Sequence, residues 1–326
     1  MLVGALKGGA EEKRPRFVAI DMARGLAIIG VVIYHFCWDL RYFGFLPVGI
    51  EDTPLWLISQ RVLLGSFMVL TGASLVLAHQ DGVRWRAFWS RFGILAIAAA
   101  AVSLGTFILF PEAFVYFGVL HAIALFSLMA VPFLRVPLGG VGLVALGFIA
   151  TALVYQSSVF NVPALAWIGF FTVPPLTNDL VPIFPWFGFV LVGVVGMRGL
   201  LARGWQQTPD RVHARDAWSK TLVWAGRWSL VIYLVHQPIL IGVLTPAANI
   251  FQPGAEQRAI EFVGSCQQSC ELGSGEARYC QRYCACSLEQ IEAGNLWDLV
   301  TTPSPGLEQS KQVATLANLC AAMAQE

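Results

Sequence analysis

Ionisable residues occur inside an otherwise apolar stretch near the start of the chain. Asp21, Arg24 and His35 lie within residues 18–37, and Asp39 follows directly. Arg24 and His35 are eleven residues apart, so in a helix they return to nearly the same face, about 16 Å apart along the axis. Asp39 lies one turn beyond His35, where a carboxylate can fix the tautomer of an imidazole and raise its basicity. The spacing therefore indicates an oriented imidazole and a separate cation on one helix.

The surrounding stretches are those of a polytopic membrane protein. Of 326 residues, 56% are hydrophobic and only 13% are charged, whereas a soluble domain carries about a quarter charged residues. The net charge of +1 argues against nucleic acid as a partner, because no strongly basic face is available to neutralise phosphates. Stretches long enough to span a bilayer as helices fall at about 18–37, 55–78, 90–110, 114–133, 138–156, 182–200 and 222–247.

This pattern predicts an all-α helical bundle with about seven transmembrane helices, followed by a small cysteine-containing helical tail. Residues 160–176 are apolar but short and contain Pro174-Pro175. They predict an interfacial or re-entrant segment, with a short eighth membrane helix as the alternative. No internal repeat of the kind that transporters show is visible.

The distribution of Lys and Arg predicts the orientation. Positive charge gathers in the N-terminal segment, in the loops after the second and fourth helices, and in residues 198–220, and it is sparse in the alternate loops. We therefore expect a cytoplasmic segment at 1–16, a membrane domain at 17–250 and an extracytoplasmic tail at 251–326. The chain would be an integral protein of a bacterial inner membrane with its N terminus inside and its C terminus outside.

With this orientation, several polar residues of the predicted spans fall at one depth. Those expected in the outer half are His35, His121, His236, Arg61 and Asp179, and those near the cytoplasmic side are Arg24 and Arg227. Each has a plain structural explanation: a histidine can join two helices, an arginine can extend to the interface, and Asp179 can cap the sixth helix. Several buried ionisable groups at one depth nevertheless favour a functional site.

The tail contains six of the seven cysteines. Cys266 and Cys270, like Cys280 and Cys284, are four residues apart and share a helix face, and residues 271–278 between the two pairs hold two glycines. A helical hairpin joined by Cys266–Cys284 and Cys270–Cys280 disulfides fits this spacing, with the two remaining cysteines as a third pair. An exported tail would lie in an oxidising compartment. The alternative is a metal or iron–sulfur site, although the usual two-residue spacings do not occur.

Four polar blocks resemble the heparan-alpha-glucosaminide N-acetyltransferase catalytic-domain family in its bacterial members. They cover about residues 17–245 and are Asp21–Leu40, Phe117–Ala124, Phe184–Gly188 and Gly226–Pro238. The Arg24 to His35 spacing is also similar to an element of the wider membrane acyltransferase superfamily. The cysteine tail is not part of the family pattern.

The resemblance implies transmembrane transfer of an acyl group, most simply acetyl, from cytoplasmic acetyl-CoA or another acyl-CoA to an extracytoplasmic sugar or glycan. By this analogy Arg24 and Arg227 bind the CoA side, and His35, oriented by Asp39, is the general base. The residues expected to bind the acceptor or to stabilise the oxyanion are His121, His236, Asp179, Arg61 and Trp186. Direct transfer and an acyl-histidine route both stay open, and no metal is predicted.

Two other classes of function compete with this interpretation. A transporter or channel for a small anion could use the same arginines and histidines along a permeation path. A membrane scaffold could bind a partner through its exported cysteine tail. The lipid bilayer is the expected environment in every case, and a homo-oligomer is among the assemblies that the sequence leaves open.

Overall fold

The computed structural model describes residues 17–46, 53–205, 216–274, 276–297, 299 and 306–325. Contacts divide the chain into two units: one holds the described residues of Met1–Asp39 and Gly49–Gly242, and the other those of Leu40–Val48 and Val243–Glu326. The predicted N-terminal segment 1–16 lies outside the described residues. The division between the units falls inside helices rather than at the predicted boundary of residue 250.

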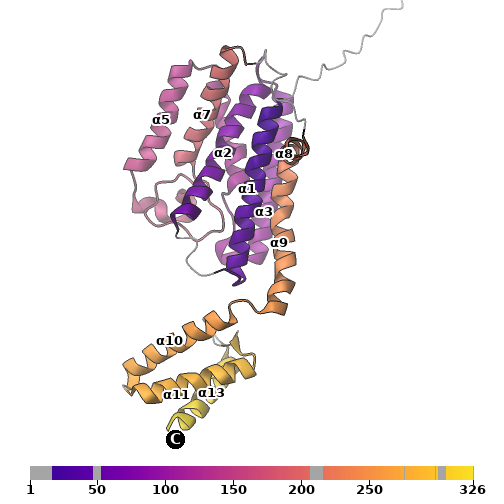
Figure 1. Ribbon diagram of the computed structural model, residues 1–326. Helices are drawn as coiled ribbons and strands as arrows, with labels where there is room; N and C mark the ends of the chain where they lie inside the picture. Colours follow the sequence, from indigo (N-terminus) through magenta and orange to yellow (C-terminus); the bar gives the residue numbers. More distant parts are fainter. Residues whose placement is uncertain are drawn as a thin grey trace, which may run out of the picture. The chain divides into compact units, whose positions relative to one another are not determined.

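The first unit is all-α over its described residues, as the sequence predicts (Figure 1). Its helices, two of which run on into the second unit, are α1 (Val18–Tyr42), α2 (Pro54–Ala78), α3 (Trp85–Leu109), α4 (Val119–Ala130), α5 (Leu138–Val154), α6 (Pro163–Ala166), α7 (Ile183–Ala202), α8 (Ala217–Arg227) and α9 (Ser229–Phe251). Of these, α1, α2, α3, α7 and α9 are long and apolar enough to cross a membrane, and α4 and α5 are apolar but shorter.

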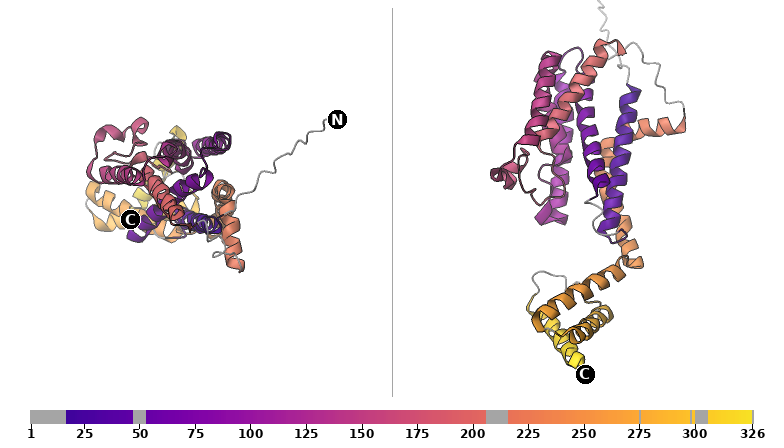
Figure 2. Two further views of the ribbon diagram at one scale, coloured as in Figure 1. Left: turned by 90° about the horizontal axis from the view of Figure 1, so that it is seen from above. Right: turned by 60° about the vertical axis from the view of Figure 1, so that its left-hand side comes forward.

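The predicted seventh span, 222–247, is wrong at its start. The chain turns at Trp228, so α8 ends at Arg227 and a separate helix, α9, begins at Ser229. Figures 1 and 2 show α8 lying across the direction of the long helices. The Asp216 side chain caps α8 by accepting from the Ser219 N–H at 2.9 Å. The buried face of α8 includes Leu222, and its exposed face includes Lys220 and Trp218. A mixed basic and aromatic surface of this kind is typical of a helix that lies at a membrane interface.

The proline-containing segment between α5 and α7 does not cross a membrane. It forms a 3₁₀ turn at Ser158–Asn161 and the four-residue helix α6, and the rest is irregular. A span needs about 20 helical residues. Of the two interpretations of residues 160–176, the structure therefore excludes the eighth membrane helix.

Glycines let the helices of the first unit approach closely. A Cβ at Gly72 of α2 would meet the carbonyl oxygen of Val190 in α7, and a Cβ at Gly193 of α7 would meet that of Val69 in α2. Small residues at helix interfaces are typical of membrane proteins, because van der Waals packing replaces the hydrophobic effect there. The contact between α2 and α7 is thus a pair of reciprocal backbone approaches, with the core residues Met68 and Leu191 fully buried beside it.

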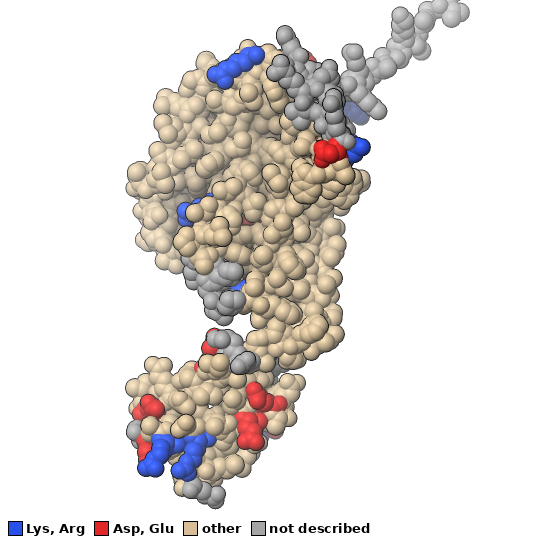
Figure 3. Space-filling view, viewed as in Figure 1, with Lys and Arg blue, Asp and Glu red and all other residues tan. Residues whose placement is uncertain are grey.

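The outer surface of this unit is apolar. Large side chains such as Ile97 on α3 and Leu153 on α5 are 73% and 82% exposed, and the face of the bundle drawn in Figure 3 carries few charged side chains. Monomeric soluble proteins rarely expose so many large apolar side chains on one continuous surface. The surface is therefore suited to contact with lipid chains.

The second unit contains the cysteine tail, which folds as three helices: α10 (Ala255–Ser274), α11 (Ala277–Ala293) and α13 (Leu307–Gln325). Disulfides Cys266–Cys284 and Cys270–Cys280 join α10 to α11, and Cys286–Cys320 joins α11 to α13. These are the pairs that the spacing suggests. Because all six sulfurs are bonded to one another, the alternative of a cysteine-ligated metal site is wrong.

The contact between α2 and α7 predicts that alanine substitutions at two glycines of α7 have different effects on stability. Gly193→Ala should lower the free energy of unfolding by about 1–3 kcal/mol, because the new methyl group forces the backbones apart. Gly196→Ala, at an exposed position with nothing within 4 Å of the added Cβ, should be neutral or slightly stabilising, because alanine favours helix. Thermal unfolding in detergent measures both variants, and equal effects would contradict the packing argument.

Candidate functional site

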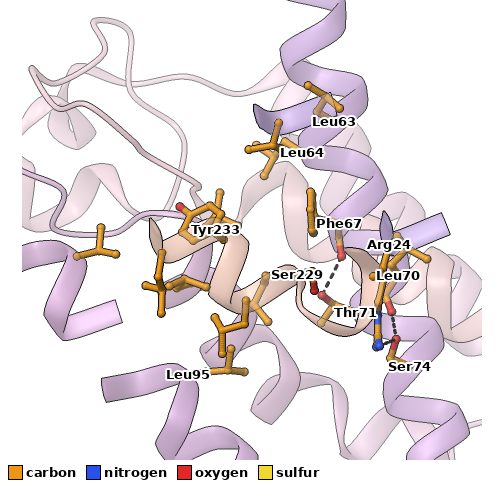
Figure 4. A pocket seen from close by; sticks show the side chains of 18 of the residues that line it. Arg24, Leu63, Leu64, Phe67, Leu70, Thr71, Ser74, Leu95, Ser229 and Tyr233 are labelled. Carbon is orange, nitrogen blue, oxygen red and sulfur yellow. Dashed lines mark hydrogen bonds between the residues drawn. The ribbon is translucent and has the colours of Figure 1, made fainter. Parts of the chain in front are cut away.

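A large cavity runs through the first unit. Its volume is about 3040 Å³, several times that of ordinary small-molecule pockets, which reach about 1,000 Å³. Its walls come from α1, α2, α3, α4, α8, α9, the loop before α7 and the C-terminal end of α7 with the residues that follow it. Figure 4 shows Arg24, Phe67, Thr71, Ser74, Leu95 and Tyr233 among the side chains that line it. Most of the lining is apolar, and polar groups gather at two places, which we call the arginine end (Asp21, Arg24, Ser74, Arg91, Arg227) and the histidine end (His35, Asp179, His236, Gln237).

At the arginine end, one carboxylate serves two guanidinium groups. Asp21 lies 3.9 Å from Arg24 and 3.4 Å from Arg227. Arg24 also donates to the Ser74 hydroxyl, which in turn donates to the Leu70 carbonyl. The close contact of α1 with α8, where Gly226 meets the Asp21 carbonyl, brings Arg227 to this position. Arg24 and Arg227, predicted together from the sequence, thus lie together in space.

Arg91 of α3 lines the same cavity. No carboxylate among the described residues forms an ion pair with it. The arginine end therefore carries more positive than negative charge, an arrangement that favours an anionic ligand. From the sequence alone Arg91 is one more positive charge near the loop after the second predicted helix, because its neighbours in space are far away in the sequence.

At the histidine end, His35 and His236 face each other across α1 and α9. Their ring centroids are 4.9 Å apart with the planes at 66°. The Nδ1 atom of His236 lies 2.8 Å from the carbonyl oxygen of Tyr233. Because a carbonyl oxygen can only accept, Nδ1 carries the proton and Nε2 presents a lone pair. The His236 side chain is buried, and Nε2 has no hydrogen-bond partner within the described chain.

Asp39 does not orient His35 as predicted. It is fully buried, and its Oδ1 accepts from Nε2 of Gln237 at 2.7 Å; no hydrogen bond links it to His35 among the described residues. The reason lies in the packing of the helices: α9 places the amide of Gln237 beside the Asp39 carboxylate, and this amide is the donor in place of His35. His35 instead lies against the ring of His236.

Asp179 reaches the cavity through pairing of two loops. The Val181 N–H donates to the Phe117 carbonyl at 3.0 Å, and Oδ2 of Asp179 accepts from the Val119 N–H at 2.8 Å. Asp179 therefore caps α4 and not the sixth predicted span, α7, which begins after Pro182. A carboxylate at a helix N-terminus is stabilised by the free N–H groups there.

Of the five predicted acceptor-binding residues, two lie away from the cavity lining, and the other three, Arg61, Asp179 and His236, lie on it. The His121 Nδ1 accepts from the Gly118 N–H and its Nε2 lies 3.3 Å from the Ser103 hydroxyl, so both ring nitrogens are engaged within the protein. Trp186 packs against Phe189 at 5.4 Å and belongs to the margin of the core. These contacts favour structural roles for both. Arg61 lines the cavity.

Residues 16–238 match the family described as heparan-alpha-glucosaminide N-acetyltransferase, catalytic. The chain belongs to this family. The match spans α1 to the first part of α9 and so contains every residue of both cavity ends, whereas the cysteine tail lies beyond it. No curated protein and no solved structure matches the chain.

The heparan-alpha-glucosaminide N-acetyltransferase family is one of membrane acetyltransferases that use acetyl-CoA as the donor. The apolar helices of the chain agree with an integral membrane protein. Gln237 also lines the cavity, but the sequence predicts no role for it beyond its place in one of the resembling blocks. A role could not be predicted from the sequence, because the hydrogen-bond partner of Gln237, Asp39, is 198 positions away.

The half-buried carboxyl of Asp179 predicts a pH dependence of the stability. Burial raises its pKa to about 6, from an ordinary value of 3.8, whereas the hydrogen bond from Val119 acts in the opposite direction. The folded state therefore holds this proton more tightly than the unfolded state. The stabilisation is complete below about pH 4 and is lost as the pH rises through 6.

Asp179→Asn keeps an oxygen that can accept from Val119 and removes the titration. Between pH 4 and 7 the unfolding temperature of the wild type should fall relative to that of the variant. Thermal unfolding in detergent across this range measures the difference, and a difference independent of pH would contradict the raised pKa.

Proposed function

We propose that this protein is a transmembrane acyltransferase that takes an acetyl group from cytoplasmic acetyl-CoA and transfers it to an extracytoplasmic sugar or glycan. The observation that carries the proposal is the single cavity that joins an arginine-rich end to a pair of histidines. Family membership supports acetyl transfer as the reaction. Transfer across a membrane needs both half-sites to share one path, and a cavity lined by both ends supports the proposal.

The arginine end suits the phosphates of CoA. Arg24, Arg91 and Arg227 line it, and Asp21 is the one carboxylate that pairs with them among the described residues. Guanidinium groups form strong, often bidentate hydrogen bonds with phosphate. The apolar middle of the cavity, with Phe67, Leu70 and Leu95, would accommodate the uncharged pantetheine arm. On the predicted orientation this end faces the cytoplasm.

The histidine end suits the chemical step. His35 lines the cavity and would accept the proton of the acceptor's amine or hydroxyl. The freed nitrogen or oxygen lone pair attacks the thioester carbonyl carbon, the new C–N or C–O bond forms, and the C–S bond breaks. The sulfur leaves as thiolate and receives the proton that His35 took up, so CoA is released as the thiol.

The first test is release of CoA from acetyl-CoA by purified protein in liposomes, with glucosamine, other amino sugars and glycan fragments as acceptors. We expect release that depends on the acceptor, and a decrease of about 10²–10⁴-fold in His35→Ala, the usual contribution of a general base. His79→Ala is the matched control, because His79 bonds to the Leu75 carbonyl at the end of α2 and does not line the cavity.

If the wild type consumes no acyl-CoA of any chain length, the acyltransferase proposal is wrong. Solute flux through the same cavity, measured in the same liposomes, would then be the function to test. Equal losses in His35→Ala and His79→Ala would remove His35 from the chemical step.

The arginine end yields a separate prediction. Arg91→Gln should raise the KM for acetyl-CoA by about 10–100-fold, because a hydrogen bond to a charged group contributes about 1.5–3 kcal/mol. The KM for acetyl-pantetheine, which lacks the nucleotide phosphates, should change little. Arg86→Gln, on the same helix but away from the cavity lining, is the control. The same increase of KM for both donors would contradict phosphate binding by Arg91.

A further inference from the structure

Two neighbouring residues of α9 present unpartnered acceptor atoms. His236 and Gln237 both line the cavity. The Nε2 atom of His236 and the Oε1 atom of Gln237 are buried, and neither has a hydrogen-bond partner in the described part of the chain. Leaving a buried polar atom unsatisfied costs about 1–3 kcal/mol, so such atoms in a cavity wall mark a place for a ligand.

The identity of both atoms follows from their partners. A carboxylate can only accept, so the Gln237 atom 2.7 Å from Asp39 is the amide nitrogen, and the oxygen is the atom left free. A carbonyl likewise can only accept, so the His236 nitrogen beside Tyr233 bears the hydrogen, and Nε2 offers a lone pair. Both free atoms are therefore acceptors.

Two free acceptors on consecutive residues of one cavity wall select the chemistry of what binds. They fit a ligand that donates hydrogen bonds from two separate groups, as an amino alcohol or a diol of a sugar does. They do not fit a thioester carbonyl or an oxyanion, which can only accept. His236 is thus better suited to the acceptor than to oxyanion stabilisation, the other role that the resemblance implies for it.

Asp39 acts through Gln237. It is fully buried and does not line the cavity, so it is placed behind the amide. Without a fixed charge there, the amide could turn and present its NH₂ group, which would repel a donor. Asp39 is therefore a positioning residue, and its hydrogen bond sets the polarity of the site.

We propose that His236 Nε2 and Gln237 Oε1 form a two-point acceptor-binding site for an amino alcohol or diol, with Asp39 fixing the amide of Gln237. The assignment rests on the proposed function only in naming this ligand the acyl acceptor. His35, 4.9 Å from His236 between ring centroids, lies beside such a ligand.

Exchange of the two polar groups tests the proposal. Asp39→Asn frees the amide of Gln237 to turn, and Gln237→Glu sets two carboxyl groups against each other. Each should raise the KM for glucosamine about tenfold or more, with the KM for acetyl-CoA within about twofold of the wild type, since the arginine end is untouched. In the double variant, the new amide on α1 donates to the new carboxylate on α9, whose second oxygen again accepts. The double variant should recover a KM close to that of the wild type.

Asp216→Asn, the same chemical change at the exposed cap of α8, controls for a general effect, because asparagine caps helices as well as aspartate. Cyclohexylamine, which has an amine and no hydroxyl, serves as a one-point acceptor and should lose less in the single variants. Thermal unfolding in detergent establishes that each variant is folded, and the double variant decides the matter if either single variant is not.

The outcomes separate this inference from the proposed function. Active single variants with an unchanged KM for glucosamine, or a folded double variant without recovery, overturn the acceptor site and leave acyl transfer standing. If the wild type transfers no acetyl group, calorimetric titration with glucosamine alone decides. Binding that weakens in the single variants and returns in the double variant supports the site, and no binding to the wild type overturns it.

Discussion

The buried hydrogen bond between Gln237 and Asp39 joins the first and the last apolar helices of the membrane unit. At 2.7 Å and with Asp39 fully withdrawn from solvent, it holds α1 against α9 at one end of the cavity. At the other end the ion pair of Arg227 with Asp21 joins α8 to α1. Polar contacts of this kind are costly to lose inside a membrane, where water does not replace them. The wall that carries His35 and His236 depends on both.

The remaining helices form a packed support for that wall. α2 and α7 approach through Gly72 and Gly193, and Gly188 lets α7 approach α5, where a Cβ would lie 2.9 Å from the Ala145 carbonyl. Close backbone contact replaces the hydrophobic effect as the source of cohesion between membrane helices. The cavity therefore lies between a glycine-packed side and a side joined by polar contacts, and its two ends differ in charge and in hydrogen-bonding character.

The family match and the two ends of the cavity cover the same residues. The match ends at residue 238, directly after His236 and Gln237, and the cavity lining ends at Gly242. The cysteine tail folds around different interactions: three disulfides join its helices, and apart from the cysteines few of its described apolar side chains are buried, Ile291 and Leu299 among them. Small domains of this size often depend on such links.

The sequence by itself determined the helical class, most membrane helices, the cysteine pairs and the presence of Arg24, His35, His236 and Asp179 as polar residues in apolar surroundings. These follow from local composition, helical period and the cost of charge in lipid.

Only the tertiary structure decided which partner each residue has. It placed Asp39 beside Gln237, Asp179 at the start of α4, and Arg91 in the cavity that Arg24 also lines. It also turned the chain at Trp228, which separates α8 from α9. Such pairs form between helices that are far apart in the chain. Hydropathy and residue spacing describe each helix by itself, so they do not predict which residues of two helices meet. A hydrogen bond or an ion pair depends on distances of a few ångströms between helices, which no pattern within one helix contains.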